Sequence, residues 1–140
     1  RYAFYSCYSL TSVTIGDSVT TIGDDAFYYC DSLTSITVDE DNPNYKSIEG
    51  NLYSKDGTVI IQYAIGKSST TFEISDSVIS IGAGAFYNCE SLTSIVIPDS
   101  VTTIGYAAFD GCPKSMIICG AAGSYVEKYA MSYGLQFKVQ

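Results

Sequence analysis

The stretch AFYSCYSLTSVTI, residues 3–15, decides the fold, because nearly the same sequence recurs along the chain. Residues 26–38 read AFYYCDSLTSITV, residues 85–97 read AFYNCESLTSIVI, and residues 107–118 carry a more divergent copy, AAFDGCPKSMII. Self-similarity at a fixed period of roughly 20 to 50 residues is typical of solenoids, in which each unit buries its apolar face only against its neighbours. The repeat therefore predicts a stack of coils.

The repeat recurs at a constant step, with one exception in the middle of the chain. Equivalent alanines stand at Ala3, Ala26, Ala85 and Ala108, with steps of 23, 59 and 23. Equivalent strand residues stand at Ile15, Val38, Ile74 and Ile97, with steps of 23, 36 and 23. One unit therefore carries 13 additional residues, since 36 exceeds 23 by 13. We expect a single domain over residues 1–140, with repeats at 1–119 and the enlarged unit at 39–74.

Apolar residues recur in columns that predict the core of this stack. Aromatic rings recur at Phe4, Phe27, Phe86 and Phe109, and leucines recur at Leu10, Leu33 and Leu92. Apolar pairs recur at Val13/Ile15, Ile36/Val38, Phe72/Ile74 and Ile95/Ile97. Because the members of each pair are two residues apart, they indicate short strands with one buried face.

The columns also carry a family resemblance. The pattern L-x-x-I-x-I, followed by P-D-S-V-x-x-I-G-x-x-A-F-x-x-C, resembles the BspA-like class of bacterial leucine-rich repeats, found in surface and secreted proteins of gut and oral bacteria. Residues 41–67 resemble a variant unit of that class. The resemblance implies a β-rich leucine-rich-repeat solenoid of short coils, about 23 residues each. Because Arg1 falls in the middle of a unit, we expect further repeats of the same chain before it.

Residues 120–140 leave the repeat and predict a C-terminal helix-plus-strand cap. Ser124 and Glu127 have the capping-box spacing, in which each side chain accepts a hydrogen bond from the other's free backbone N–H. One apolar helical face would hold Val126, Tyr129, Ala130 and Tyr133. Gly134 stands where a left-handed C-terminal cap is expected. The alternating residues Leu135, Phe137 and Val139 predict a closing strand, which would cover the edge of the last coil.

Composition argues against several classes of function. The net charge is −8, so a nucleic-acid partner would be repelled. Histidine is absent, which removes the commonest general base, the usual partner of a nucleophilic Ser or Cys, and the commonest zinc ligand. No apolar run approaches the roughly 18 residues of a membrane span. We therefore expect no enzyme, no cofactor, no nucleic-acid partner and no membrane insertion.

Four of the five cysteines share one column of the repeat. They are Cys7, Cys30, Cys89 and Cys112, with Cys119 outside the column. Stacked coils lie about 5 Å apart, a separation that does not by itself forbid a disulfide between neighbours. Equivalent side chains point in parallel, however, so we expect reduced, inaccessible thiols that act as small apolar fillers, with bridges as the alternative.

A column of acidic residues follows the strands. Its members are Asp17, Glu40, Asp76 and Asp99. One interpretation is turn chemistry, in which Asp and Ser side chains bond nearby backbone N–H groups. The weaker alternative is a calcium site, because Ca²⁺ takes several oxygen ligands. No EF-hand or G-G-x-G-x-D repeat accompanies the column, so we expect no bound metal.

The outward strand positions form the remaining patterned surface. They are Ser12, Thr14, Ser35, Thr37, Thr71, Glu73, Ser94 and Val96. Small and β-branched residues suit a sheet for structural reasons alone. The alternative is a recognition face on one continuous surface, the use to which solenoids commonly put such ribbons.

The resemblance implies a function at the level of a class. We expect a non-catalytic module of an extracellular or cell-surface bacterial protein, which binds a host or microbial surface protein or glycan in adhesion or host interaction. The alternative is a structural spacer that displays another domain. Outward residues that vary between repeats favour binding, whereas monotony favours a spacer. Glu73 and Val96 break the Ser/Thr pattern and so favour binding.

Overall fold

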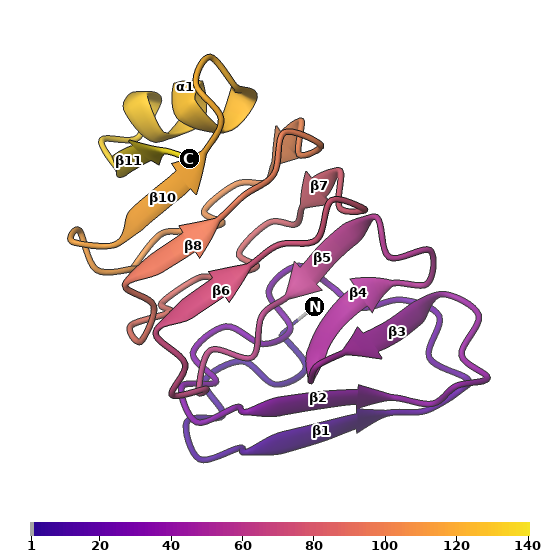
Figure 1. The fold of residues 1–140 in the computed structure, drawn as a ribbon. Helices are drawn as coiled ribbons and strands as arrows, with labels where there is room; N and C mark the ends of the chain where they lie inside the picture. Colours follow the sequence, from indigo (N-terminus) through magenta and orange to yellow (C-terminus); the bar gives the residue numbers. More distant parts are fainter. Residues whose placement is uncertain (1) are drawn as a thin grey trace.

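The computed structural model describes residues 2–140 and has the expected architecture. The chain forms a β-solenoid of about six turns that follow the period of the repeat, and one C-terminal helix and a strand come after them. Figure 1 shows the coils stacked from the first strands at one end to the helix at the other. The fold class predicted from the repeat is confirmed.

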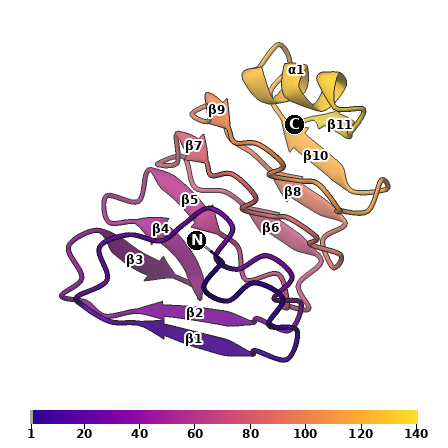
Figure 2. The ribbon, with the colours of Figure 1, turned by 180° about the vertical axis from the view of Figure 1, so that it is seen from behind.

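Eleven short strands form three sheets among the described residues. The first sheet pairs β1 (Ser12–Ile15) with β2 (Ser35–Val38). The second, in spatial order, contains β11 (Gln136–Val139), β10 (Ile117–Gly120), β8 (Ser94–Val96) and β6 (Thr71–Glu73). The third contains β3 (Tyr45–Ile48), β4 (Asn51–Ser54), β5 (Val59–Gln62), β7 (Ser80–Ile81) and β9 (Thr103–Ile104). Seen from behind, the second and third sheets form two walls of the stack (Figure 2).

The parallel registers repeat the sequence period. Ser12 pairs with Ser35 and Thr71 pairs with Ser94, so β1 and β6 each lie beside the equivalent strand of the next coil, β2 and β8. The aromatic column stacks in the core as predicted, with ring centroids 5.6 Å apart for Phe4 and Phe27 and 5.1 Å apart for Phe86 and Phe109. Gly105 closes a corner where the backbones meet, because a Cβ there would lie 2.4 Å from the Ala83 nitrogen. The core therefore follows from equivalent residues packing on each other.

The enlarged unit adds a hairpin to the stack. Strands β3 and β4 pair antiparallel, and their turn places Glu49 and Gly50 at φ 53° and 77°. Strand β5 then returns antiparallel to β4 and joins β7 in parallel. The insertion therefore contributes both a hairpin and a regular coil, whereas the repeat pattern predicted one enlarged unit.

The C-terminal cap differs in detail from the prediction. Helix α1 spans Tyr125–Ser132, and the Ser124 hydroxyl accepts a 3.1 Å hydrogen bond from the Glu127 N–H. The Glu127 carboxylate accepts from the N–H of Gly123, not from that of Ser124, so the capping box is shifted by one residue. Gly134 has φ 67°, as expected of a left-handed cap. Tyr133 is the C-cap residue and stacks on Tyr129 with ring centroids 4.4 Å apart, so the two rings share a face as predicted, although Tyr133 is 62% exposed.

Candidate binding surface

The outward strand positions point away from the core, as alternation predicts. In β1 and β2 the exposed Thr14 pairs with the exposed Thr37, while Val13 and Ile36 between the outward residues are buried. In β6 and β8, Thr71 pairs with Ser94 and Glu73 pairs with Val96. The four residues of the first group are Ser12, Thr14, Ser35 and Thr37; those of the second are Thr71, Glu73, Ser94 and Val96.

The two groups do not form one continuous ribbon, so that part of the prediction is wrong. Strand β2 has no pairing with β6, because the hairpin turn lies beside it. The carbonyl oxygen of Gly50 accepts a 2.8 Å hydrogen bond from the Ile36 N–H, and the Ser47 hydroxyl donates to the Ile36 carbonyl. Figure 1 shows the β3–β4 hairpin next to β2. The insertion therefore divides the strand-lined face into two short ribbons. The first ribbon lies on β1 and β2, and the second ribbon lies on β6 and β8.

A hollow lies between the hairpin turn and β6. One part, of about 480 Å³, is lined by Ile48, Glu49, Tyr53, Phe72, Glu73, Ile74, Ser75, Asp76 and Ser77. The other part, of about 550 Å³, is lined by Glu49, Thr71, Phe72, Glu73, Ser94 and Val96. Glu49, Phe72 and Glu73 belong to both parts, so we treat them as one feature, the hairpin groove. The groove contains the second ribbon of the predicted surface.

The hairpin groove combines apolar and acidic side chains. Ile48 is 39% exposed and Phe72 is half-buried, so both offer apolar surface. The side chains of Glu49, Glu73 and Asp76 are exposed and take part in no hydrogen bond or ion pair within residues 2–140. Exposed carboxylates beside partly exposed apolar groups provide polar contacts around a surface that a ligand can desolvate.

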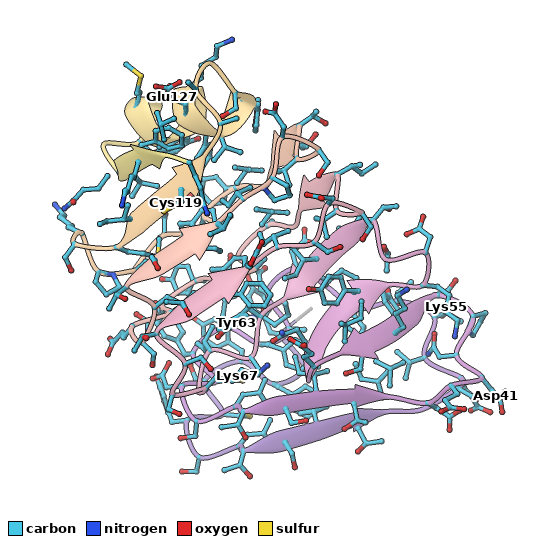
Figure 3. The ribbon with its side chains drawn as sticks, in the orientation of Figure 1. Asp41, Lys55, Tyr63, Lys67, Cys119 and Glu127 are labelled. Carbon is cyan, nitrogen blue, oxygen red and sulfur yellow. The ribbon has the colours of Figure 1, made fainter. Side chains whose placement is uncertain are left out.

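Lys67 is the basic residue that holds the hairpin turn. Its ammonium group donates to the Glu49 carbonyl oxygen and lies 5.5 Å from the centre of the Tyr63 ring. Figure 3 labels Lys67 and Tyr63 close to each other. Burial lowers the pKa of Lys67, while nearby Glu49 acts in the opposite direction. The ammonium therefore holds the wall of the groove through the Glu49 backbone carbonyl and not through the Glu49 carboxylate.

The acidic column remains at exposed turns. Asp17, Glu40, Asp76 and Asp99 are all exposed, and the Ser18 hydroxyl donates to Asp17 over 2.9 Å. Asp76 and Asp99 line one shallow hollow together with Glu73. Among residues 2–140, no three carboxylate or thiol groups lie close enough together to hold a metal ion. The calcium alternative therefore has no geometric support.

The cysteine column is less enclosed than predicted. All five cysteines are free thiols in the structure, but only Cys30 and Cys89 are fully buried; Cys7 and Cys112 are partly exposed. The Cys30 thiol donates to the Phe4 carbonyl oxygen and the Cys112 thiol donates to that of Phe86. Burial raises the pKa of Cys30 and Cys89 to about 11 and that of Cys112 to about 12. These three thiols are therefore weak nucleophiles at neutral pH.

Sequence reasoning missed three features of this surface. Cys119 pairs with Val96 and Lys138, so its partly exposed side chain extends the second ribbon towards the cap. Glu49 belongs to this surface because it stands in the hairpin turn, and the hairpin has no equivalent in the other coils. Tyr63 lies beneath the groove. Its place in the aromatic column can be predicted from the period, because it stands 23 residues before Phe86.

The BspA-type leucine-rich-repeat model matches residues 1–68 and 58–138, in six copies. The chain belongs to the BspA-type leucine-rich-repeat family. This agrees with the resemblance carried by its repeated motif and with the six turns of the fold. No curated protein matches the chain.

Three solved structures are similar to this BspA-type chain. A leucine-rich repeat protein from Eubacterium ventriosum has 33% identity and a TM-score of 0.72 over 81% of this chain. A leucine-rich cell surface protein from Faecalibacterium prausnitzii has 35% identity and a TM-score of 0.69 over 79%. The pneumococcal vaccine antigen PcpA shares the fold, with 14% identity and a TM-score of 0.55 over 94%. The chain spans 32%, 29% and 56% of these three structures.

The described part of the chain has no helix long and apolar enough to cross a bilayer.

Proposed function

We propose that this chain is a non-catalytic binding module of a bacterial cell-surface or secreted protein. Its ligand is a host or microbial surface protein or glycan, and its role is adhesion or host interaction. Two similarities support this proposal: one relative is described as a cell surface protein, and the fold is shared with a pneumococcal antigen. The observation that carries it is the hairpin groove, where exposed carboxylates adjoin the partly exposed Ile48 and Phe72.

The groove is a better candidate than the first ribbon for two reasons. Its outward residues differ between coils, since Glu73 pairs with Val96, whereas Ser12 and Thr14 pair with identical residues in β2. It is also a hollow, which lets a ligand contact side chains of the hairpin, β6 and β8 together. Binding would then combine burial of Phe72 and Ile48 with hydrogen bonds to the glutamates and hydroxyls around them.

The monotony of the first ribbon supports a second candidate function. Identical Ser and Thr pairs across β1 and β2 suit a structural spacer, in which outward residues need only favour the sheet. A spacer would use the coils to project another domain, and the groove would have no ligand.

The test is a screen of the chain on an array of glycans and extracellular-matrix proteins, followed by two matched variants on any hit. The groove variant carries Thr71→Arg and Glu73→Arg, and the control variant carries Thr14→Arg and Thr37→Arg. Both change two exposed strand residues, so both are expected to fold. We expect the groove variant to lose binding by about tenfold or more, because it reverses a charge within the contact.

Equal loss in both variants would place the ligand elsewhere than the groove. Retained binding in the groove variant with loss in the control would favour the first ribbon. A screen with no hit would favour the spacer.

A further inference from the structure

Strand β6 has an open edge in the interior of the stack. It pairs in parallel with β8 on one side (Figure 1), and no strand of the described chain pairs with its other side. Coils of the chain both precede and follow β6, so the edge is open because of the local structure around it. The edge faces the hairpin groove, since Thr71, Phe72 and Glu73 all line that hollow.

The hydrogen bonds to β8 show which backbone groups face the groove. In a parallel sheet, alternate residues of a strand direct both their N–H and their C=O groups to the same neighbouring strand. The Ile74 N–H donates to the Val96 carbonyl oxygen over 2.9 Å, so Ile74 and Phe72 face β8. The backbone groups of Thr71 and Glu73 therefore face the groove, where they have no hydrogen-bond partner within residues 2–140.

The hairpin explains why this edge is open. Strand β2 holds the equivalent position in the preceding coil, and its free edge is occupied by the hairpin turn. The Ile36 N–H donates to the Gly50 carbonyl oxygen, and the Ser47 hydroxyl donates to the Ile36 carbonyl oxygen. The hairpin thus separates β2 from β6 and bonds to β2, but it does not pair with β6. The backbone donors and acceptors of Thr71 and Glu73 remain available on the side of the hollow.

The two faces of β6 differ in chemistry. Thr71 and Glu73 are exposed on the outward face, and Asp76 is exposed in the turn that follows. Phe72 lies on the opposite face, is half-buried and lines the same part of the groove as Ile48, which is 39% exposed. A chain lying along this edge would therefore meet a carboxylate on one of its faces and apolar groups on the other.

We propose that the hairpin groove binds an extended segment of a partner protein, which adds a strand to β6. The segment alternates basic and apolar residues. Its backbone bonds to Thr71 and Glu73, its basic side chains pair with Glu73 and Asp76, and its apolar side chains pack on Phe72 and Ile48. This inference rests on the proposed function, because it identifies the ligand of the same groove as a protein segment.

The spacing and the charge of the groove select this occupant. Thr71 and Glu73 are two residues apart, so their backbone groups repeat about every 6.6 Å, which is the repeat of another extended chain. The chain has a net charge of −8. Lys67, the basic residue beside the groove, already donates to the Glu49 carbonyl oxygen. A basic segment therefore meets charge complementarity as well as an open strand edge.

Two other occupants fit the edge less well. A second copy of the chain would bring one acidic groove against another, and the like charges would repel each other. A glycan can accept and donate hydrogen bonds at Glu73, but it does not present the alternating N–H and C=O groups that Thr71 and Glu73 match.

The probe is an acetylated and amidated heptapeptide in which lysine and valine alternate. Seven residues exceed the three of β6, so a shift of two residues retains the same contacts. One modified peptide carries N-methyl groups on its lysines and another carries them on its valines. In an added strand only one of these two sets directs its N–H groups at β6. Calorimetry measures the binding of all three peptides to the whole chain.

We expect one methylated peptide to bind at least about tenfold more weakly than the parent, and the other to bind within about threefold of it. Loss with the methylated lysines would indicate an antiparallel strand, in which hydrogen-bonded residues directly opposite each other share a face of the sheet. Loss with the methylated valines would indicate a parallel strand. A peptide with glutamate in place of lysine should bind at least about tenfold more weakly than the parent.

Amide hydrogen exchange measured by NMR locates the added strand. The amides of Thr71 and Glu73 should exchange rapidly in the free chain and at least about tenfold more slowly with saturating parent peptide. The Phe72 amide is the control within the same strand, because it faces β8 and should exchange slowly in both states.

A variant of the chain removes one donor from the edge. Thr71→Pro deletes an N–H that faces the groove, at an edge position where proline is tolerated, and should weaken binding of the parent peptide about tenfold. Thr71→Val is the matched control, since it retains the N–H and a β-branched side chain, and should bind as the wild type does. Circular dichroism verifies folding. If Thr71→Pro does not fold, the methylated peptides test the same edge on the wild-type chain.

The proposal is overturned if the parent peptide does not bind, or if both methylated peptides bind as tightly as the parent. It is also overturned if saturating peptide leaves the exchange of Thr71 and Glu73 unchanged. A glycan that the groove variant Thr71→Arg with Glu73→Arg no longer binds, together with no binding of the peptide, would overturn strand addition and leave the proposed function intact.

Discussion

Tyr63 stacks on Phe86, with ring centroids 5.1 Å apart and ring planes inclined by 24°. The inserted coil lacks the A-F-x-x-C motif, yet it places an aromatic ring at the same point of the core as its neighbours. Tyr63 also meets Phe72 at 4.9 Å, so it joins the aromatic column to the strand that lines the groove. The core is therefore continuous through the insertion although the motif is not.

Replacing Tyr63 with alanine tests this continuity. Tyr63 is 1% exposed, so Tyr63→Ala would leave a cavity, and we expect a loss of about 3–5 kcal/mol in the free energy of unfolding. Tyr63→Phe retains the ring and should lose less than about 1.5 kcal/mol. Urea denaturation measures both. Similar stabilities for the two variants would contradict a role for the ring in the column.

The period made the core predictable from the sequence. Residues one period apart occupy equivalent places, so Phe4 and Phe27, or Ser12 and Ser35, could be paired without any structure. The same arithmetic finds Tyr63, although its neighbours differ from the motif.

The hairpin was not predictable in this way, because residues 45–54 have no equivalent in other coils. Its position depends on contacts such as Gly50 with Ile36, which join segments without a common register. The groove and the divided ribbon follow from those contacts. The stacking of Tyr28 on Tyr87 likewise depends on Ala64 being small, a property of one coil that a repeat pattern does not reveal.

Thiol labelling tests the cysteine column. Cys30, Cys89 and Cys112 have pKa values raised by burial to about 11, 11 and 12, so little thiolate exists at pH 8. We expect Cys7 and Cys119 to react first with a thiol reagent, and the other three only after denaturation. The Cys119→Ser variant should have one fewer thiol that reacts rapidly. If all five thiols of the native chain react rapidly, the burial of Cys30, Cys89 and Cys112 is contradicted.

The turn between β4 and β5 predicts a pH dependence. The Asp56 carboxylate accepts from the backbone N–H and the hydroxyl of Thr58 and from the hydroxyl of Ser54, and these bonds lower its pKa to about 2. Because the folded value lies below the unfolded value of 3.8, the stabilisation is present above about pH 4 and is lost as pH falls through about 2. Carbon-detected NMR titration should find this pKa, and Thr58→Val should raise it. A pKa near 3.8 for Asp56 in the wild type would contradict these hydrogen bonds.

Loss of the Ser124 hydroxyl should weaken the cap. Ser124 is 8% exposed and accepts from the Glu127 N–H, so Ser124→Ala should lower the free energy of unfolding by about 0.5–2 kcal/mol. Ser132→Ala is the control, because its exposed hydroxyl only donates back to the Lys128 carbonyl within the helix. Thermal melting measures both, and a larger effect at Ser132 would contradict the capping role.

Asn42 ties the insertion to the turn that follows β1 in the first coil. Its side chain is fully buried and makes four hydrogen bonds: Nδ2 donates to the carbonyl oxygens of Gly16 and Val19, and Oδ1 accepts from the N–H groups of Asn44 and Tyr45. Asn42→Ala would leave these four backbone groups without their partner. We expect a loss of about 3 kcal/mol or more, because each buried group left unsatisfied costs about 1–3 kcal/mol.

Two further variants separate hydrogen bonding from shape. Asn42→Asp retains the size and the two accepted bonds, but places oxygen in place of Nδ2 against two carbonyl oxygens, so it should be destabilised as strongly as the alanine variant. Asn44→Ala removes an exposed side chain whose single bond to the Thr20 carbonyl is 3.4 Å long, and it should change stability by less than about 0.5 kcal/mol. Urea denaturation compares all three, and limited proteolysis reports opening of the hairpin. If the Asn42 variants unfold at the same urea concentration as Asn44→Ala, the insertion is held by its strand pairing alone.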